Sequence, residues 1–570
     1  MPPTPEDLLP VGASGRRPAR VSVLLAWVVV ALIYLTGVTG QWWPSPDSAL
    51  YLGLGRSLAE GHGYQFNGEV CNFIPPVLPG ILAGLRWAFG ESFWWPNLFV
   101  ALCGLAAFGM IFAALARMGD PRTALIVALA TALSYVFYFN AHMVLTDVPF
   151  AALFWASAYC AARLRHGSRW WALSMVLLAI LSVSVRAPGL ILVIVLGIGL
   201  VLDGLASAGR RRRLWAGAGI LSGMGGVGAG LLVLGRLAGR TTPLYARVVA
   251  AHVRIGLGGH LRQLAEGLQR MPSVLAEFLT SQSGAVPLGI LVGGLMVWGL
   301  IVLIRRRQWL IPTMVVLYPI ALVLAVGSRS IRPRYLLAIQ PVLLLAILEG
   351  LWALVRLCGR RRGLGVSPTR HFRTMLIAGG LIVLANGPRV FRNAFYHRWL
   401  SGTERYYRTV RDGQFEELFQ VTGLLRSSGL RAGPAGVEAD KVSILHYLSR
   451  RRTVALPSND RITAADAEAI HTFAVAHPEL TGFVLNIGEG QTVFLETLKA
   501  RFGRTAGLIR VHSGKHYQVY ARSPAPVSGA PAAPSRPGAG REGSSAGPRS
   551  TGSGPGSRPA GRPAGASTRP

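Results

Sequence analysis

The sequence predicts an all-α polytopic membrane protein with about eleven transmembrane helices, followed by a small α/β domain. Composition is the first observation: hydrophobic residues make up 51% of the 570 residues, charged residues only 15%, and the mean hydropathy is +0.41. Soluble globular domains carry about 25% charged residues. The second observation is that long apolar runs continue up to residue 391, whereas residues 392–522 have a soluble composition. An ordinary soluble enzyme and a wholly disordered chain are therefore excluded.

The transmembrane region is expected within residues 21–391. A bilayer core of about 30 Å needs about 20 apolar residues in a helix. The segments that approach this length are 21–39, 93–116, 121–140, 148–164, 170–185, 187–203, 213–236, 285–304, 309–327, 335–357 and 374–391. The first segment lacks a small-residue cleavage site, so we expect a retained anchor rather than a signal peptide.

The apolar stretch 170–203 is divided because it contains an arginine near its middle. An arginine at the bilayer centre costs about 2.5–3.5 kcal/mol on insertion scales. The residues after Arg186 are Ala187-Pro188-Gly189, which is a turn signal. We therefore expect two short helices that meet at Arg186.

Arginine clusters between the spans predict the orientation. With a cytoplasmic N-terminus, every short cluster falls on the cytoplasmic side, as the positive-inside rule requires; the clusters begin at Arg16, Arg117, Arg163, Arg210, Arg305 and Arg356. Loop 40–92, the turn 141–147 and segment 237–284 then face outward. Arginines among apolar residues in 237–284 favour an amphipathic helix on the membrane surface. The net charge of +33 thus reflects topology, and no nucleic-acid partner is expected.

Glycines are dense in the seventh expected span. Gly219 and Gly223, like Gly226 and Gly230, have the GxxxG spacing. This spacing predicts close packing of that span against a neighbouring helix.

Three further segments lie outside the membrane. Residues 1–20 are expected to form a disordered cytoplasmic leader. Residues 392–522 alternate predicted helices with predicted strands (AGVEA, TVALP, GFVLNI and the hairpin GLIRVHSGKHYQVYAR), which indicates an extracytoplasmic α/β domain. Residues 523–570 are rich in Pro, Gly, Ser and Arg and cannot bury a core, so we expect a disordered tail.

Two aspartates lie at the predicted outer face, each at the start of a helix. Asp47 opens the segment DSALYLGLGRSLAEG, and Asp147 ends the segment VLTD before a Val-Pro pair. Taken singly, each is as well explained by helix capping as by catalysis, because Asp is a favoured N-cap residue. The same side of the membrane also carries Arg186, Arg329, Arg332 and Arg334.

Carboxylates beside several guanidinium groups at a membrane rim suit one kind of reaction. Arginines can hold a lipid-linked phosphate through paired hydrogen bonds. A carboxylate can accept the proton of an attacking hydroxyl, a general-base contribution of about 10²–10⁴ in rate. These groups indicate a substrate in which an activated sugar is attached to a polyprenyl phosphate in the outer leaflet.

Five segments occur in the order that a known family shows. They are DSALYLGLGRSLAEGHG at 47–63, PPVLPGILA at 75–83, VLTDVPFAALF at 144–154, VRAPGLILVIV at 185–195 and RPRYLLAIQPVLLL at 332–345. Together they resemble the bacterial branch of the dolichyl-phosphate-mannose–protein mannosyltransferase-like family, over roughly residues 20–360. That family belongs to the GT-C glycosyltransferases and includes the lipid A aminoarabinose transferases.

The resemblance implies a role for each group. Asp47 would be the catalytic base or would orient the acceptor, and Asp147 would help to set the same site. The donor phosphate would be bound by Arg334, Tyr335, Arg332 and Arg186. The fold would be a GT-C helical bundle in the bacterial inner membrane, with amphipathic helices and the α/β domain on the extracytoplasmic side. The activity would be inverting transfer of a hexosyl or pentosyl group.

The sequence departs from this family at two positions. Many relatives follow the first aspartate with glutamate, where this chain has Ser48, and the aminoarabinose transferases carry a basic residue where this chain has Ile74. One hard carboxylate does not make a Mg²⁺ or Mn²⁺ site, so no metal ligands are assigned and a divalent cation stays open as a cofactor. For Glu69, His62 and His142, ordinary loop solvation is the favoured explanation and substrate contact is the alternative.

The competing functional class is a transporter or flippase of lipid-linked saccharides. Transporters usually show internal repeats and ionisable residues near the middle of the membrane, whereas no repeat is evident here and the acids lie at the rim. We therefore expect a glycosyltransferase in the lipid bilayer whose donor is a polyprenyl-phosphate sugar. The sequence does not indicate whether its acceptor is a protein, a lipid or a glycan.

Overall fold

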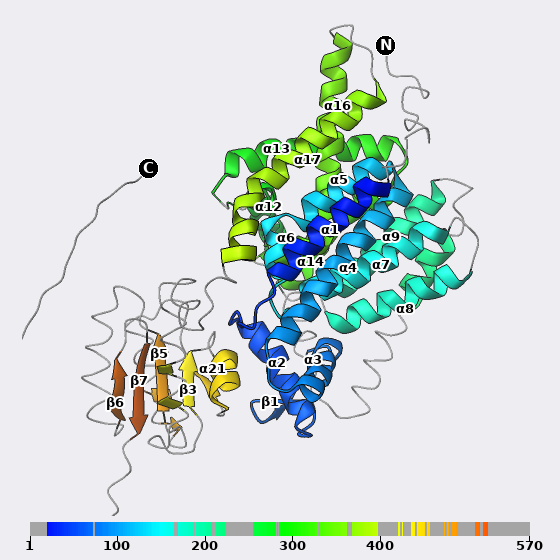
Figure 1. Cartoon of the computed structure of the whole chain (residues 1–570). Helices are drawn as coiled ribbons and strands as arrows, with labels where there is room; N and C mark the ends of the chain where they lie inside the picture. Colours follow the sequence, from blue (N-terminus) through cyan, green and yellow to red (C-terminus); the bar gives the residue numbers. More distant parts are fainter. Residues whose placement is uncertain are drawn as a thin grey trace, which may run out of the picture. The chain divides into compact units, whose positions relative to one another are not determined.

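A computed structural model of the chain describes most of residues 20–396 and several short segments beyond them (Figure 1). The longer described stretches are 20–71, 74–164, 169–186, 189–206, 213–223, 255–280, 284–328, 331–361 and 367–396; the shorter ones lie between 420 and 522. All of them belong to one compact unit that spans Met1–Ser523. The expected leader and tail lie outside the described residues.

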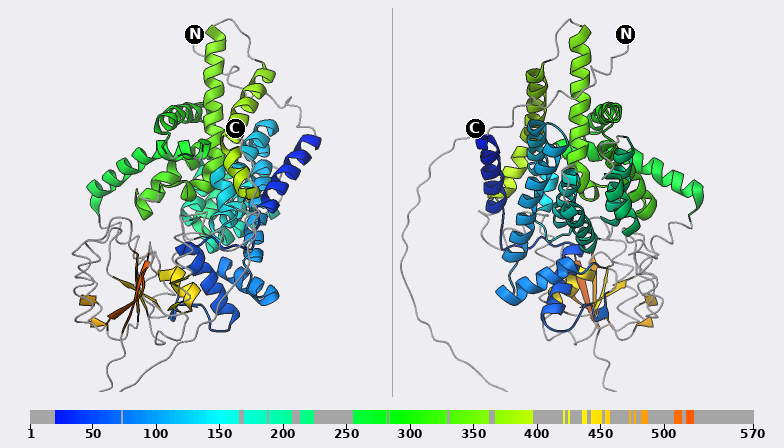
Figure 2. Two further views of the ribbon diagram at one scale, coloured as in Figure 1. Left: turned by 60° about the vertical axis from the view of Figure 1, so that its left-hand side comes forward. Right: turned by 90° about the vertical axis from the view of Figure 1, so that its right-hand side faces the viewer.

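Helices dominate the part of the chain up to residue 396. They are α1 (Arg20–Thr36), α2 (Pro46–Ala59), α3 (Val77–Phe89), α4 (Trp94–Met118), α5 (Pro121–Ala132), α6 (Tyr135–Asn140), α7 (Asp147–Arg163), α8 (Arg169–Val185), α9 (Gly189–Leu205), α12 (Gly256–Thr280), α13 (Val286–Arg305), α14 (Leu310–Val326), α15 (Pro333–Leu336), η5 (Leu337–Ile339), α16 (Gln340–Arg361), α17 (Pro368–Phe391) and η6 (Arg392–Tyr396). Helices α1, α4, α7 and α8 lie side by side (Figures 1 and 2).

Helices occupy most of the described part of every segment that the sequence predicts to span the membrane. Four helical segments are long and apolar enough to cross a bilayer: Trp94–Met118, Val286–Arg305, Pro333–Gly359 and Thr369–Ala394. The remaining apolar helices are shorter. The chain is therefore a mostly helical membrane protein, and the count of eleven spans stays a prediction.

The expected span 121–140 is two helices rather than one. Helix α5 ends at Ala132 and α6 begins at Tyr135. The hydroxyl of Ser134 accepts the N–H of Phe137 and so caps a new helix. A local side-chain hydrogen bond of this kind competes with the continuing helical ladder, which is why the single-helix prediction was wrong here.

The break at Arg186 is confirmed. Helix α8 ends at Val185 and α9 begins at Gly189. The N–H of Gly189 donates to the carbonyl of Arg186 at 2.9 Å and closes the turn. A Cβ at Gly189 would lie 2.4 Å from the ring of Phe150, so the turn also requires a residue without a side chain.

Close packing in the described part of the seventh expected span does not use the predicted glycines. Only residues 213–223 of this span are described, so Gly226 and Gly230 lie outside. A Cβ at Gly219 or Gly223 would meet nothing within 4 Å, so close packing at this pair was a wrong prediction. The close approach occurs at Gly217, where a Cβ would lie 2.5 Å from the carbonyl oxygen of Gly197. The face that meets α9 is therefore displaced from the GxxxG pair.

The backbones of α13 and α16 approach each other closely. A Cβ on Gly299 would overlap the carbonyl oxygen of Ala346, and one on Gly350 would overlap that of Leu295. Small residues that let two backbones approach are a common basis of helix packing in membranes. This contact fixes α16, the helix that follows directly from α15 and η5.

The outer loop 40–92 is more structured than the sequence analysis anticipated. It contains α2, a short antiparallel hairpin of β1 (Gln65–Phe66) and β2 (Glu69–Val70), and α3. The described part of the expected amphipathic segment is α12; residues 237–254 lie outside the description. The hairpin strands have two residues each, too few for a period-2 pattern, and α3 is apolar but shorter than a membrane span, which is why neither was predicted.

Beyond residue 420 the strands fall where they were predicted. They are β3 (Ala435–Glu438), β4 (Thr453–Leu456), β5 (Gly482–Asn486), β6 (Leu508–Ser513) and β7 (Tyr517–Arg522), in the order β4-β3-β5-β7-β6. Strand β3 is parallel to β4 and β5, and β5-β7-β6 is antiparallel (Figure 1).

A helix that was not predicted, α21 (Val442–Ser449), connects β3 to β4. The helices expected at 415–425 and 463–476 are described at only a few residues, and the one at 492–502 lies outside the description. The α/β domain over 392–522 therefore stays a prediction as a whole.

Substitution of Gly299 by valine is expected to destabilise the bundle by about 1–3 kcal/mol or more, because the new side chain would meet backbone. The measurement is thermal unfolding of the detergent-solubilised protein followed by tryptophan fluorescence. Gly294→Val, on the same helix with nothing within 4 Å of its Cβ, is the matched control. Equal melting temperatures for the two variants would contradict the packing described here.

Candidate active site

Asp47 lies at the start of α2 but does not cap it. Ser45 is the N-cap: its side chain accepts the N–H of Ser48, and the Ser48 hydroxyl accepts the N–H of Ser45. This reciprocal capping box satisfies the free donors of the first turn. The capping interpretation of Asp47 is therefore wrong, because two serines already do this work and the carboxylate is left for another partner.

Asp147 begins α7, and its carboxylate does not cap that helix either. Thr146 occupies the N-cap position without a side-chain cap hydrogen bond. The Asp147 side chain is only 2% exposed, so its charge must be compensated inside the protein. The capping interpretation is wrong here, because the carboxylate of Asp147 contacts arginines that are distant in the sequence and not the N–H groups of its own helix.

Arg334 connects the two aspartates. Its Nη2 donates to Oδ2 of Asp47 at 2.5 Å, and its Nε donates to Oδ2 of Asp147 at 3.0 Å. Arg334 lies in α15, whose first residue is Pro333, a residue suited to the first position of a helix. The start of α15 thus meets the starts of α2 and α7, although the three residues are far apart in the sequence.

Arg186 supplies the second guanidinium group. Its Nη1 lies 2.7 Å from Oδ1 of Asp147, an ion pair that departs from hydrogen-bond geometry, and it donates to the hydroxyl of Thr146 at 3.1 Å. The Arg186 side chain is 8% exposed. Asp147 therefore has one arginine at each oxygen. Together with Asp47 and Arg334, the cluster holds two negative and two positive charges.

Aromatic side chains support both guanidinium groups. The ring of Tyr335 lies 5.1 Å from the guanidinium carbon of Arg186 and 5.7 Å from that of Arg334, within cation–π range. The carbonyl of Tyr335 accepts the hydroxyl of Tyr318 at 3.0 Å. Tyr335 thus joins the site through its ring, as its place in the predicted site suggested.

The sequence analysis missed Tyr51. It lies one helical turn after Asp47 on the same face of α2, and its hydroxyl shares a hydrogen bond of 3.3 Å with that of Thr146. Burial, and after it the charge of Asp47, raises the pKa of Tyr51 above its usual value, so the hydroxyl keeps its proton. The four-residue spacing from Asp47 was the available signal.

The two carboxylates differ in their access to solvent. The Asp47 side chain is 44% exposed, whereas that of Asp147 is 2% exposed. In the described part of the chain, Oδ1 of Asp47 receives no hydrogen bond, while both oxygens of Asp147 face arginines. Asp47 can accept a proton from an approaching molecule, and Asp147 is suited to holding the two arginines in place.

Four predicted site residues are not brought into this cluster. The Arg332 side chain is exposed and forms no ion pair with a described residue; Arg329 lies outside the description. His62 and Glu69 are exposed around the β1–β2 hairpin, with Nδ1 of His62 3.7 Å from a carboxylate oxygen of Glu60. His142 is buried, with its ring nitrogens 2.9 Å from the carbonyls of Tyr138 and Tyr34.

No group of three or more His, Cys, Asp and Glu side chains is placed to hold a metal ion among the described residues. The hydroxyl of Ser48, which stands where many relatives have a carboxylate, accepts the indole N–H of Trp42 at 3.0 Å. The carboxylates of Asp47 and Asp147 face guanidinium groups rather than each other. The guanidinium groups of this cluster are therefore suited to binding an anion.

The fold and this charged cluster define a class: a mostly helical membrane protein in which the starts of α2, α7 and α15 meet at two aspartates and two arginines. The family model described as dolichyl-phosphate-mannose-protein mannosyltransferase matches residues 74–225. This range contains three of the five segments on which the resemblance was based, and the resemblance is confirmed. The match covers less than half of the chain.

Solved structures show the same fold. The chain is similar to ArnT from Cupriavidus metallidurans bound to undecaprenyl phosphate, with a TM-score of 0.56, 15% sequence identity, and coverage of 89% of this chain and 99% of that one. The apo state of the same protein gives a TM-score of 0.52 at the same identity and coverage. A search of curated proteins found no significant match.

Asp147→Asn is expected to destabilise the protein by about 3–5 kcal/mol, because it removes the counter-charge of buried Arg186 and weakens that of Arg334. Asp47→Asn should cost much less, since Asp47 is 44% exposed and surface ion pairs contribute about 0–1 kcal/mol. Thermal unfolding of the two variants in detergent tests this order. A larger loss for Asp47→Asn would contradict the assignment of Asp147 as the structural centre of the cluster.

Proposed function

We propose that the protein is a membrane glycosyltransferase that moves a sugar from a polyprenyl-phosphate donor to an extracytoplasmic acceptor. The observation that carries the proposal is the bridge formed by Arg334 between Asp47 and Asp147. It places a solvent-accessible carboxylate next to a guanidinium group that can bind phosphate. The undecaprenyl phosphate bound by the similar ArnT structure and the name of the matching family support the choice of donor.

The reaction is a single displacement at the anomeric carbon of the sugar. The acceptor hydroxyl attacks this carbon while its proton passes to Oδ1 of Asp47. The bond between the anomeric carbon and the phosphate oxygen breaks, and its electron pair leaves with the polyprenyl phosphate. Arg334 and Arg186 stabilise the charge that develops on the leaving group, which is the main electrostatic requirement of such a step. One displacement inverts the anomeric configuration.

Each remaining member of the cluster has a positioning role in this proposal. Asp147 holds both arginines through its two oxygens. Tyr335 supports their flat faces, and Thr146 accepts a hydrogen bond from Arg186. Arg332 would contact the donor phosphate only after a side-chain rearrangement, because it is exposed and outside the cluster.

The membrane arrangement belongs to the proposal as well. We place about eleven spans within residues 21–391 in the bacterial inner membrane, with a cytoplasmic N-terminus and the α/β domain of residues 392–522 outside. The transferred group is a hexosyl or pentosyl sugar. The charged cluster then lies at the outer rim of the bilayer, where a lipid phosphate is presented.

Asp47→Asn is expected to lower the rate of sugar transfer by about 10²–10⁴-fold, the usual contribution of a general base. The measurement is incubation of the purified protein with a panel of radiolabelled polyprenyl-phosphate sugars and detection of the one consumed. Asp120→Asn is the matched control, because Asp120 caps α5 and Asn caps equally well. Flipping of the lipid-linked sugar without transfer by the unaltered protein would instead support the transporter.

Arg334→Lys is expected to raise the KM for the donor by about 10–100-fold, because a lysine cannot replace the paired donors of the guanidinium and a charged hydrogen bond contributes about 1.5–3 kcal/mol. The kinetic comparison includes Arg332→Lys. A larger effect at Arg332 than at Arg334 would assign the phosphate to the exposed arginine and contradict the proposal.

A further inference from the structure

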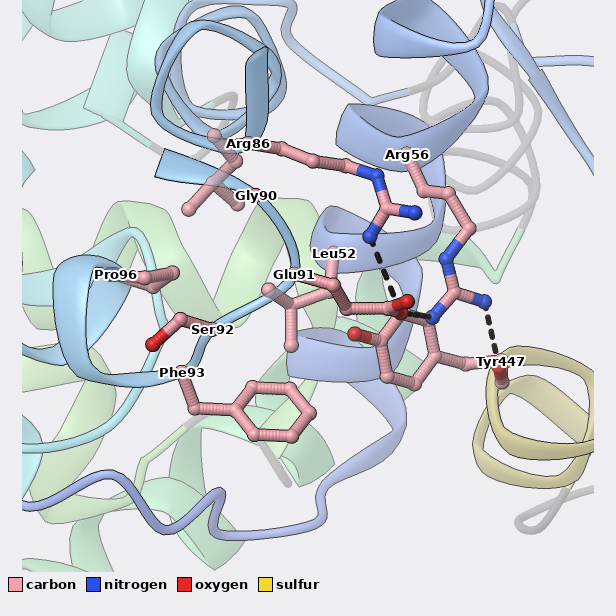
Figure 3. Close-up of a pocket in the computed structure, with 10 residues that line it drawn as sticks. Leu52, Arg56, Arg86, Gly90, Glu91, Ser92, Phe93, Pro96 and Tyr447 are labelled. Atoms are coloured by element: carbon pink, nitrogen blue, oxygen red, sulfur yellow. Dashed lines mark hydrogen bonds and ion pairs between the residues drawn. The ribbon is translucent and has the colours of Figure 1, made fainter. Parts of the chain in front are cut away.

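The end of α2 opposite Asp47 is held by a segment from the C-terminal part of the chain. Arg56, in the last turn of α2, donates from Nη1 to the carbonyl of Tyr447 at 2.8 Å. Its guanidinium carbon also lies 4.2 Å from the centre of the Tyr447 ring. Figure 3 shows Arg56 reaching from α2 to Tyr447 on α21. A backbone hydrogen bond and a cation–π contact thus join α2 to α21.

The carboxylate of Glu91 also stabilises this junction between α2 and α21. Glu91, between α3 and α4, lies 2.6 Å from Nη2 of Arg56 and 3.1 Å from Nη1 of Arg86 (Figure 3). It also lies 3.1 Å from Nη2 of Arg450. Burial acts to raise the pKa of Glu91, but the hydrogen bond from Arg86 and the charges of both neighbouring arginines outweigh it, so the pKa is lowered. The carboxylate stays ionised until the pH falls through that lowered pKa.

The tip of the β1–β2 hairpin makes a second, uncharged junction. Asn67, at a positive φ of 58°, accepts the N–H of Thr453 with Oδ1 at 2.7 Å and donates from Nδ2 to the Thr453 carbonyl at 2.5 Å. Its own N–H donates to Nε2 of His446 at 3.1 Å. Strand β4 is at the edge of its sheet, so one asparagine side chain pairs with both backbone groups of an edge residue.

Aromatic packing connects α21 to the turn that carries Asp47. The Tyr447 ring is buried and lies 5.1 Å from the ring of Trp42. The indole N–H of Trp42 donates to the hydroxyl of Ser48 at 3.0 Å, and Ser48 is the capping-box residue directly after Asp47. Tyr447 therefore reaches the first turn of α2 through Trp42 and the last turn through Arg56.

We infer that α21 and β4 form a clamp that sets the position of α2, and that Tyr447 and Asn67 are positioning residues for Asp47. This inference rests on the proposed function for its catalytic consequence. A helix is rigid over the nine residues from Asp47 to Arg56, about 13 Å, so a shift at one end moves the other. The clamp adjusts the approach of the carboxylate to the acceptor without contacting either substrate.

The arginines of the cluster have one carboxylate partner outside the clamp. Arg334 contacts Asp47 on α2, but both Arg334 and Arg186 also contact Asp147 on α7. Asp147, Arg186 and Arg334 lie on α7, on the α8–α9 turn and on α15, and no hydrogen bond or ion pair found among the described residues joins these three to α21. Loosening the clamp should therefore displace Asp47 and leave the phosphate site in place. The kinetic signature is a lower kcat with an unchanged KM for the donor.

The first experiment follows hydrogen exchange of the full-length protein in lipid nanodiscs and needs no substrate. Tyr447→Ala and Asn67→Ala are expected to speed exchange of the peptide that covers residues 46–59 at least tenfold, with little change in α4 and α7. Tyr447→Phe should behave as the unaltered protein, because it keeps the ring and the main-chain carbonyl. Val70→Ala, on the exposed side of the same hairpin, is the matched control.

The second experiment measures sugar transfer by the same variants with the donor that the panel identifies. The expected result is a kcat lower by about 10–100-fold for Tyr447→Ala, since a misplacement near 1 Å costs up to about that factor, with a donor KM within twofold. Tyr447→Phe should restore kcat. If Tyr447→Ala does not fold, Asn67→Ala at the hairpin tip decides the question.

Three results would overturn the clamp. If hydrogen exchange in residues 46–59 is as slow in Tyr447→Ala and Asn67→Ala as in Val70→Ala, α21 does not hold α2. Faster exchange with an unchanged kcat would remove the positioning role. A raised donor KM at unchanged kcat would make the segment part of donor binding. Failure of every donor in the panel would count against the proposed function alone, because the exchange measurement stands without it.

Discussion

A single guanidinium group that contacts two carboxylates determines how the starts of three helices meet. Asp147 is 2% exposed, and an isolated carboxylate at such a position costs several kcal/mol. The start of α7 can therefore be buried only if Arg334 and Arg186 come with it. Arg334 in turn brings the start of α2 through Asp47. Charge balance at buried positions thus adds to the apolar packing that holds these helix starts together.

The same balance explains how the site could bind an anion. The cluster holds two arginines against two aspartates, so a donor phosphate adds negative charge to a neutral group. The pair most easily released is the one between Arg334 and Asp47, since Asp47 is 44% exposed and uses one oxygen. Asp147 has arginines on both oxygens and is buried. In the proposed reaction the incoming phosphate therefore takes the place of Asp47 at Arg334, and the Asp47 carboxylate is then free to accept the proton of the acceptor hydroxyl.

Apolar run length made the helical bundle predictable, and local turn chemistry located the break at Arg186. The same local reasoning failed at Asp47 and Asp147, because a capping residue is chosen by competition. At α2 the hydroxyls of Ser45 and Ser48 form the capping hydrogen bonds. At α7 the carboxylate of Asp147 contacts arginines that are distant in the sequence. The order of segments predicted a site that contains both aspartates and Arg334, and these three side chains are in contact. The location of both aspartates on the outer side of the membrane stays a prediction.

The actual contacts could not be predicted, because they join residues 187 and 287 positions apart. Arg332 and Arg334 are equivalent as sequence, and only the backbone of α15 directs one inward and leaves the other exposed. His142 was a candidate because it precedes Asp147 by five residues, yet its ring lies between two carbonyl oxygens of α1 and α6. Sequence proximity to a site residue is a weak guide where a turn intervenes.

Helix α2 shows why a domain distant in sequence can matter to chemistry at the membrane. The loop that contains it is predicted to lie outside the membrane, where lipid packing would not restrain it as it would restrain a membrane-spanning helix such as α4. The first turn of α2 is bound to Arg334 and capped by Ser45, and its last turn is bound to Tyr447 and Glu91. A short helix held only at the catalytic end would rotate about that end, and each rotation would move Oδ1 of Asp47 relative to the donor phosphate. Restraint at the far end removes this freedom before the substrates bind, which lowers the entropy that the reaction must otherwise overcome.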